Sequence, residues 1–236
     1  MKRVAAASLV LSIIALVSAC ATGVPGSGSG TGLVAPSEGV GESAELDAAW
    51  LDDGRMIGLV TWGSSTCVPT VDGVSAEGQI VRVALIDAEA DACTADMAAR
   101  VTLITTPESL DVGKDVTIAV SGAIESSDEL EGDAALAGPG GMTDNLPSAG
   151  WADDLIVILS WGSSTCVPVL EKIEATGAAE LTATFAEVPD DQVCTMDIGP
   201  RALVSDAPEL EEDDDAFLVM LGDEFDNVRV PILGER

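Results

Sequence analysis

A hydroxyl-rich octapeptide occurs twice in the chain and holds the residues whose types could do chemistry. The sequence WGSSTCVP at positions 62–69 recurs unchanged at 161–168, and each occurrence is followed by Cys-Thr-x-Asp-x-x-x-Arg, at 93–100 and at 194–201. Indole, hydroxyl, carboxylate and guanidinium groups are therefore repeated as a set. Ten residues of the set are possible binding residues: Trp62, Ser64, Ser65, Asp96, Arg100, Trp161, Ser163, Ser164, Asp197 and Arg201.

The Gly-Ser-Ser-Thr segment has two interpretations. It could line a small polar pocket or an anion-binding nest beside the tryptophan. It could instead be a tight turn whose hydroxyls satisfy local amides between a strand and a disulfide, with the tryptophan packed on the bridge. We favour the turn. A serine nucleophile is poorly supported, because the chain has no histidine and neither GxSxG nor SxxK. No catalytic residue is predicted.

The aspartate and the arginine of each repeat are four residues apart. An ion pair between Asp96 and Arg100, and another between Asp197 and Arg201, would hold the cysteine loop against its module. The alternative is a paired site for a carboxylate or sugar ligand. The acidic run at 209–215 lacks the alternating ligands and the glycine of a calcium loop, so it predicts a solvated loop. No metal or cofactor is predicted.

Four of the five cysteines belong to the repeat. If each module once stood alone, it had to pair its own two cysteines, which predicts the disulfides Cys67–Cys93 and Cys166–Cys194. Such bridges are typical of exported proteins. A metal site or a redox pair is disfavoured, because the chain has neither CxxC nor histidine.

The fifth cysteine, Cys20, follows a segment typical of an export signal. Residues 1–19 contain two basic residues, an apolar run at 4–17 and two small residues before the cysteine. Residues 16–20, LVSAC, resemble the lipobox of bacterial lipoproteins, which implies cleavage before Cys20 and a diacylglycerol on its thiol. Two acyl chains anchor a protein stably where one is marginal. Residues 20–42 are rich in Gly and Ser and predict a flexible tether.

The composition excludes some partners and predicts others. With 41 acidic against 10 basic residues and a net charge of −31, the chain is not a nucleic-acid binder. Anionic lipid would repel its surface, so membrane association is expected to come from the diacylglycerol on Cys20. The expected location is the extracytoplasmic face of the cell membrane. Hydrophobic residues make up 47%, enough to bury a core.

The periodicity predicts an all-β fold made of two tandem, disulfide-stabilised small modules related by internal duplication. Apolar or alternating runs indicate strands at 56–62, 80–86, 100–105 and 116–121, with counterparts at 155–161, 181–185, 202–204 and 217–221, and one more at 228–233. We expect modules at 43–123 and 148–236, each of four or five strands, joined by an acidic Gly/Pro linker at 124–147. Packing of the modules face to face about a pseudo-twofold axis would enlarge their small cores.

Over residues 50–223, the repeated WGSSTCVP and CTxDxxxR motifs resemble a domain of exported proteins and lipoproteins of high-GC Gram-positive bacteria. The resemblance implies no catalytic role. The first hypothesis is a lipid-anchored surface protein, not an enzyme, that binds a protein, a glycan or a wall component, through loops such as 70–79 and 169–178 that differ between the repeats. The alternatives are a solute- or ion-binding lipoprotein with a pocket between the modules, and a hydrolase that uses paired carboxylates.

Overall fold

The computed structural model describes residues 44–189, 191–222 and 224–236, and within them the protein is all-β. Cys20, the signal segment and the tether lie outside the described residues. The first module contains β1 (Leu46–Leu51), β2 (Met56–Gly63), β3 (Thr70–Glu77), β4 (Ile80–Ile86), β5 (Ala98–Thr105), β6 (Val116–Gly122) and β7 (Ser126–Leu130). The second contains β8 (Ser148–Ala152), β9 (Leu155–Gly162), β10 (Leu170–Gly177), β11 (Glu180–Phe185), β12 (Gly199–Asp206), β13 (Phe217–Leu221) and β14 (Val228–Leu233).

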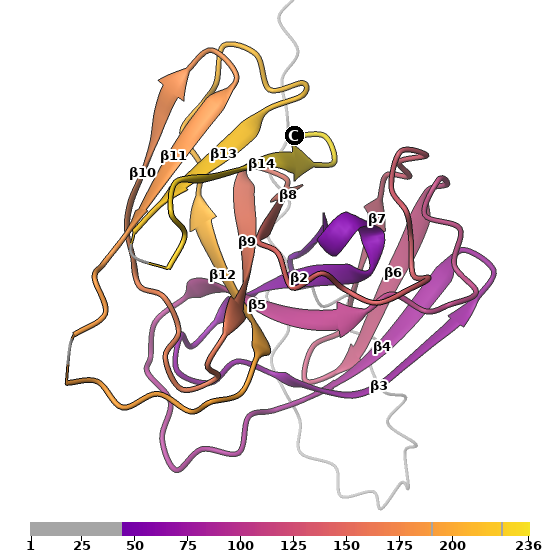
Figure 1. Ribbon diagram of the computed structural model, residues 1–236. Helices are drawn as coiled ribbons and strands as arrows, with labels where there is room; N and C mark the ends of the chain where they lie inside the picture. Colours follow the sequence, from indigo (N-terminus) through magenta and orange to yellow (C-terminus); the bar gives the residue numbers. More distant parts are fainter. Residues whose placement is uncertain (1–43, 190, 223) are drawn as a thin grey trace, which may run out of the picture. The chain divides into compact units, whose positions relative to one another are not determined.

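The two modules share one strand order (Figure 1). In the second module the sheet runs β10-β11-β13-β14-β8-β9-β12, with the β11–β13 and β14–β8 pairs parallel and the others antiparallel. In the first module β3-β4-β6-β7 and β1-β2-β5 repeat that order as two sheets, because β7 and β1 lie in contact without backbone pairing. A single short 3-10 turn, η1 (Asp52–Gly54), joins β1 to β2.

Each module therefore has seven strands within the described residues, and the prediction of four or five was wrong. The runs predicted as strands are all strands, but β1, β8, β3, β10 and β7 were not predicted. Strands β3 and β10 are polar and mostly exposed along their length, so they lack the alternation of a half-buried strand. They also account for the predicted binding loops at 70–79 and 169–178, which are mainly these two strands and not loops.

The predicted linker at 124–147 is also wrong in part, since it contains β7. This acidic strand pairs with β6 from Val116↔Leu130 to Val120↔Ser126. Leu130 and Leu136 are buried in the first core, so the first module continues well past residue 123. The prediction also made 228–233 a strand of the second module only, whereas β7 occupies the same position beside β6 that β14 has beside β13.

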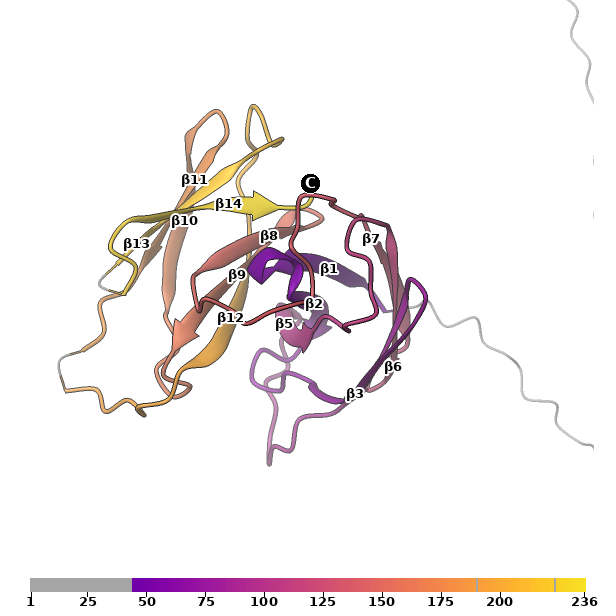
Figure 2. The same ribbon diagram turned by 45° about the vertical axis from the view of Figure 1, so that its right-hand side comes forward.

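Each module has its own hydrophobic core. The first core is formed by one face of β1 and β2, including the fully buried Trp50, against β4 and β6. Figure 2 shows the sheet of β1, β2 and β5 beside the sheet that contains β3, β6 and β7. The second core uses the matching strands and contains Trp151, with Phe185 and Phe225 in contact at 4.6 Å between ring centroids. The first tryptophan of each repeat is thus a core residue.

A third cluster buries the outer faces of β1, β2 and β5 against those of β8, β9 and β12. Val60 and Leu159 are fully buried in it, which explains why β2 and β9 are continuous apolar runs with no alternation. Gly150 lies so close to the first module that a Cβ there would overlap the carbonyl oxygen of Trp50. The described residues from 44 onward accordingly belong to one compact unit, in which the modules pack face to face.

Two of the main contacts across this interface join a strand to its counterpart. Strand β1 contacts β8, and β5 contacts β12. Contact between equivalent elements is what a twofold arrangement produces. In the part of the chain that the structure describes, no helix has the length and apolar character needed to cross a membrane.

Candidate functional site

The two predicted disulfides are present and close the equivalent loops of the two repeats. Cys67 is bonded to Cys93, and Cys166 to Cys194, with sequence separations of 26 and 28. Each octapeptide makes a tight turn before its cysteine, because the Cys67 amide donates to the Ser64 carbonyl at 3.3 Å. The corresponding amide of Cys166 donates to the Ser163 carbonyl at 3.2 Å. The turn interpretation of Gly-Ser-Ser-Thr thus has its expected backbone geometry.

The hydroxyls of the first repeat converge on Thr94, which follows the second cysteine. The Thr94 hydroxyl lies 2.8 Å from Ser64 Oγ and 3.3 Å from Thr66 Oγ1. It also donates to Asp96 Oδ1. The Ser65 amide donates to the same carboxylate oxygen at 3.1 Å, and the Thr94 amide donates to Thr66 Oγ1 at 3.1 Å. These bonds hold the two segments of the disulfide loop side by side.

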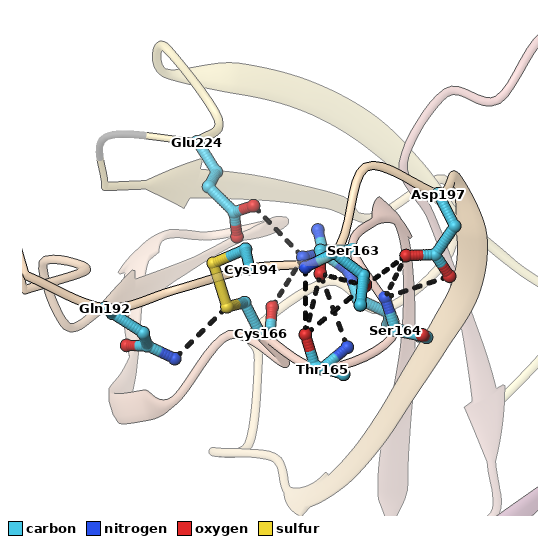
Figure 3. The surroundings of a disulfide bond; sticks show 10 residues. Ser163, Ser164, Thr165, Cys166, Gln192, Cys194, Asp197 and Glu224 are labelled. Atoms are coloured by element: carbon cyan, nitrogen blue, oxygen red, sulfur yellow. Dashed lines mark hydrogen bonds and ion pairs between the residues drawn. A yellow bond between two sulfur atoms is a disulfide. The ribbon is translucent and has the colours of Figure 1, made fainter.

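The second repeat makes the same set of bonds (Figure 3). Thr195 Oγ1 lies 2.8 Å from Ser163 Oγ and donates to Asp197, and the Thr195 amide donates to Thr165 Oγ1 at 3.1 Å. The Ser164 amide donates to Asp197 Oδ1 at 3.3 Å. Gln192 adds one bond without a counterpart, from its amide nitrogen to Cys166 Sγ at 3.2 Å. The network therefore belongs to the motif and recurs independently of the surrounding sequence.

These bonds lower the pKa of both aspartates. The hydroxyl of Thr94, followed by Ser65, lowers the pKa of Asp96 from 3.8 to about 2. The hydroxyl of Thr195, followed by Ser164, lowers the pKa of Asp197 from 3.8 to about 2 in the same way. Donors aimed at a carboxylate stabilise its charged form. Both groups are consequently weak bases that stay ionised at neutral pH.

The predicted ion pairs between aspartate and arginine are wrong. Arg100 turns away from Asp96 and donates to the Cys67 carbonyl at 2.7 Å and to the Ser64 carbonyl at 3.3 Å. Arg201 donates to the carbonyls of Cys166 and Trp161 at 2.7 and 3.1 Å. Each arginine lies on a strand, β5 or β12, that pairs with the strand leading into the turn, β2 or β9. Its guanidinium therefore lies beneath the turn and bonds to the backbone carbonyls there.

A glycine makes this position of the arginine possible. A Cβ at Gly63 would lie 2.7 Å from Arg100 Cζ, and one at Gly162 would lie 2.7 Å from Arg201 Cζ. The side chain of Arg201 is 2% exposed and pairs with Glu224 at 3.0 Å. The close contact therefore gives a structural reason why the motif repeats both the glycine and the arginine.

The tryptophans of the motif lie apart from its serines. Trp62 and Trp161 pack against the cluster between the modules. A cavity of about 280 Å³ adjoins Trp62, but its lining is largely apolar: Ala44, Glu45, Thr61, Trp62, Met97 and Ile124. Ser64, Ser65, Asp96 and Arg100 are not part of that lining, so the structure does not bring the ten predicted binding residues into one pocket.

A second cavity, of about 400 Å³, lies between the modules and was not located by the sequence. It is lined by the η1 turn and Arg55 on one side and by residues of β14, including Arg229, on the other. Arg55 Nε is buried without a hydrogen-bond partner among the described residues. The sequence held one signal, since Gly54 and Arg55 lengthen the turn after Trp50 by two residues relative to the turn after Trp151.

A pair of carboxylates lies at the β1–β7 contact of the first module. Burial, followed by the charges of Asp128, Asp153 and Glu45, raises the pKa of Asp47 from 3.8 to about 6. Burial also raises the pKa of Asp128, which accepts a hydrogen bond from the Ala48 amide. Neither residue lines the two cavities described above. Among the described residues, no group of three or more His, Cys, Asp or Glu side chains is arranged to hold a metal ion.

Comparison of the chain with protein-family models, with curated proteins and with solved structures gives no match.

Proposed function

We propose that the protein is a lipid-anchored, extracytoplasmic binding module and not an enzyme. This proposal rests on the hydrogen bonds that the repeated polar groups make. The hydroxyls and carboxylates of both loops are engaged with one another and with backbone amides. Carboxylates with a pKa of about 2 are poorly matched to proton transfer at neutral pH. The motif thus builds a rigid scaffold, and binding is left to the surface around it.

The anchor is supported by the sequence at Cys20 and by the two disulfides, which suit an oxidising compartment. The resemblance of the repeat to a domain of exported proteins supports the same location. Replacement of Cys20 with Ala is expected to release the protein into the medium or to leave it unprocessed. Fractionation and mass spectrometry of the N-terminus measure both outcomes. A processed Cys20→Ala protein that still sediments with membranes would contradict the anchor.

The absence of catalysis is tested directly on the full chain. We expect no turnover on panels of ester, peptide and glycoside substrates. Turnover that a single Asp or Ser substitution abolishes, with the fold intact, would replace this function with the carboxylate hydrolase. Asp47→Asn and Asp128→Asn are the first variants to compare in that case, because their carboxyls carry the raised pKa values.

The cavity between the modules favours one second candidate, a solute-binding lipoprotein. Its Arg55 has a buried nitrogen without a partner in the described chain, and Arg229 lies in the same lining. Asp52, Asp53 and Asp144 share this lining, and Asp52 and Asp53 pair with the other nitrogens of Arg55 at 3.7 and 3.8 Å. The lining therefore suits a small solute that carries both charges, such as an amino acid. Thermal-shift titration with glycine, alanine and serine should then raise Tm for the unmodified chain and not for Arg55→Gln. If none of them shifts Tm, this candidate is rejected.

A further inference from the structure

The disulfide loops of the second module expose large aliphatic side chains. Val193 and Met196 are 91% and 103% exposed, and Ile198 is 70% exposed. Val167 and Val169, on the other side of the bridge, are more than half exposed. We refer to these five residues as the aliphatic patch. Exposed apolar area of this kind is a common mark of an interaction surface.

The bridge and the hydroxyl network hold the two segments that carry these residues side by side. Cys166 and Cys194 have Cα atoms 5.6 Å apart, so their neighbours Val167 and Val193 lie on adjacent stretches of backbone. Thr195 and Asp197 both bond to the facing segment, through Thr165 and the Ser164 amide. Met196 stands between them and is fully exposed. The patch is consequently carried by a rigid loop.

The first module shows that the fold does not need the side chains of Val193 and Met196. Aligned on Cys93 and Cys194, the positions of Val193 and Met196 hold Ala92 and Ala95, which are also exposed. Both loops close the same disulfide and make the same network with Thr94 or Thr195. The larger residues in the second loop therefore serve something other than stability.

The charges around the patch define the chemistry of a partner. Residues 186–198 include four acidic residues and no basic one, and the whole chain carries −31. An anionic bilayer or a second copy of the chain would be repelled at this surface. A polypeptide segment that combines aliphatic side chains with Lys or Arg would be attracted and would bury the patch.

We propose that the aliphatic patch, centred on Val193 and Met196, is the docking surface for a basic, aliphatic polypeptide segment. This inference rests on the proposed binding function and assigns that function to one face of one module. It also gives a reason for the difference between two loops that share a scaffold.

The test uses the full chain carrying Cys20→Ser and three synthetic peptides. One peptide is made of Leu and Lys, the second has Glu in place of Lys, and the third has Ser in place of Leu. The methyl signal of Met196 reports on the patch by NMR, and that of Met142, which is 89% exposed elsewhere, is the internal control. Calorimetry measures Kd.

We expect the Leu/Lys peptide alone to bind and to shift Met196 and not Met142. The double variant Val193→Ala, Met196→Ala gives the second loop the side chains of the first without a change of charge. It should weaken binding about tenfold or more, because truncation of central apolar contacts has effects of that order. Tm should change little, since both sites are exposed. The reverse variant, Ala92→Val with Ala95→Met, should add a weaker second site.

Several outcomes would overturn the inference. Equal Kd for the double variant, or equal shifts at Met196 and Met142, would show nonspecific attraction to the acidic surface. Preference for the Leu/Glu peptide, or no binding to any peptide, would refute the partner's chemistry. Patch-dependent binding to phosphatidylcholine vesicles would make the partner a lipid surface, and a patch-dependent dimer would make it a second copy. Each of these results leaves the proposed function standing, because that function is tested separately, by the fractionation of the Cys20→Ala protein and by the substrate panels.

Discussion

At the scale of single residues, the repeated motif is explained by contacts that its members make with one another. Arg201 occupies the space that a side chain at Gly162 would need, and Arg100 does the same at Gly63. Thr195 and Ser164 hold Asp197 in its ionised form. The spacing from glycine to cysteine to arginine is therefore a geometric requirement of one loop.

Gly162→Ala is expected to destabilise the protein by about 2 kcal/mol or more, because the new methyl must displace a buried, bonded guanidinium. Gly73→Ala in β3 is the matched control. Its Cβ would meet nothing within 4 Å, so its effect should stay near zero or be slightly favourable. Urea unfolding measures both free energies. Equal values for the two variants would contradict the role of the glycine.

Asp197→Asn is expected to lower Tm at pH 7, because the neutral amide is a weaker acceptor for Thr195 and Ser164. The carboxylate has a depressed pKa, so its contribution is complete above 3.8 and is lost as the pH falls toward about 2. The difference in Tm between variant and parent should therefore close over that range. Asp96→Asn should show the same pH dependence. A difference in Tm between variant and parent that stays constant down to pH 2 would contradict this prediction.

At the scale of elements, the two modules differ where the first strand meets the last. In the second module β14 pairs with β8 through Ile232↔Ala149 and Leu233↔Gly150. In the first module the corresponding amide, that of Ala48, donates to the Asp128 carboxylate. Asp47 lies beside this contact with a raised pKa. The stability of the β1–β7 contact is thus expected to depend on pH between about 4 and 6.

Asp47→Asn is expected to raise the free energy of unfolding at pH 7 by about 1 kcal/mol, because it removes a partly buried charge next to other carboxylates. The parent carboxyl has a raised pKa, so the contribution of Asp47 to stability is complete below 3.8 and is lost as the pH rises through about 6. Urea unfolding between pH 4 and 7 should show the variant's advantage growing with pH. An advantage that is largest at pH 4 would refute the assignment.

The disulfides are expected to stabilise their modules equally. Each closes a loop of similar length, 26 or 28 residues, and each is worth about 3 kcal/mol in the chain-entropy estimate. Cys67→Ala with Cys93→Ala and Cys166→Ala with Cys194→Ala should therefore lower the free energy of unfolding by similar amounts. Non-reducing peptide mapping checks the pairing. A link from Cys67 to Cys166 or Cys194 would be incompatible with this structure.

At the scale of the whole molecule, the interface between the modules couples their stability. The outer faces of β2 and β9 are buried only because the other module covers them. Val157, for example, would lie 3.1 Å from a Cβ at Gly58 of the first module. Separation of the modules would expose this third cluster, so we expect the two modules to unfold together.

Leu159→Ala is expected to cost about 2–4 kcal/mol and to lower a single calorimetric transition without splitting it. Leu159 is fully buried in the interface cluster, so the loss falls on the shared cluster. Val71→Ala on the exposed strand β3 is the control, with an expected change below about 0.5 kcal/mol. Two transitions, with only one of them shifted, would show that the modules unfold independently.

The sequence by itself determined the all-β class, the two disulfides and nine of the strands, although it missed the short buried strands β1 and β8. These features rest on local information: periodicity, branched side chains and the arithmetic of paired cysteines. The repeat shows which residues of the two modules correspond, so Thr94 and Thr195 could be expected to make matching contacts. The same pattern could not reveal β3 or β7, because exposed strands at the margins of a sheet carry no hydrophobic alternation.

Only the tertiary structure decided what Asp96 and Arg100 touch. Their spacing predicted an ion pair. The register of β5 against β2 instead places the Arg100 guanidinium against the Cys67 carbonyl, and Asp96 accepts a hydrogen bond from the Thr94 hydroxyl. The cavity beside Arg55, the pKa of Asp47 and the burial of both faces of β2 likewise depend on which segments meet across the interface between the modules. Such meetings join residues about a hundred positions apart, and no local pattern encodes them.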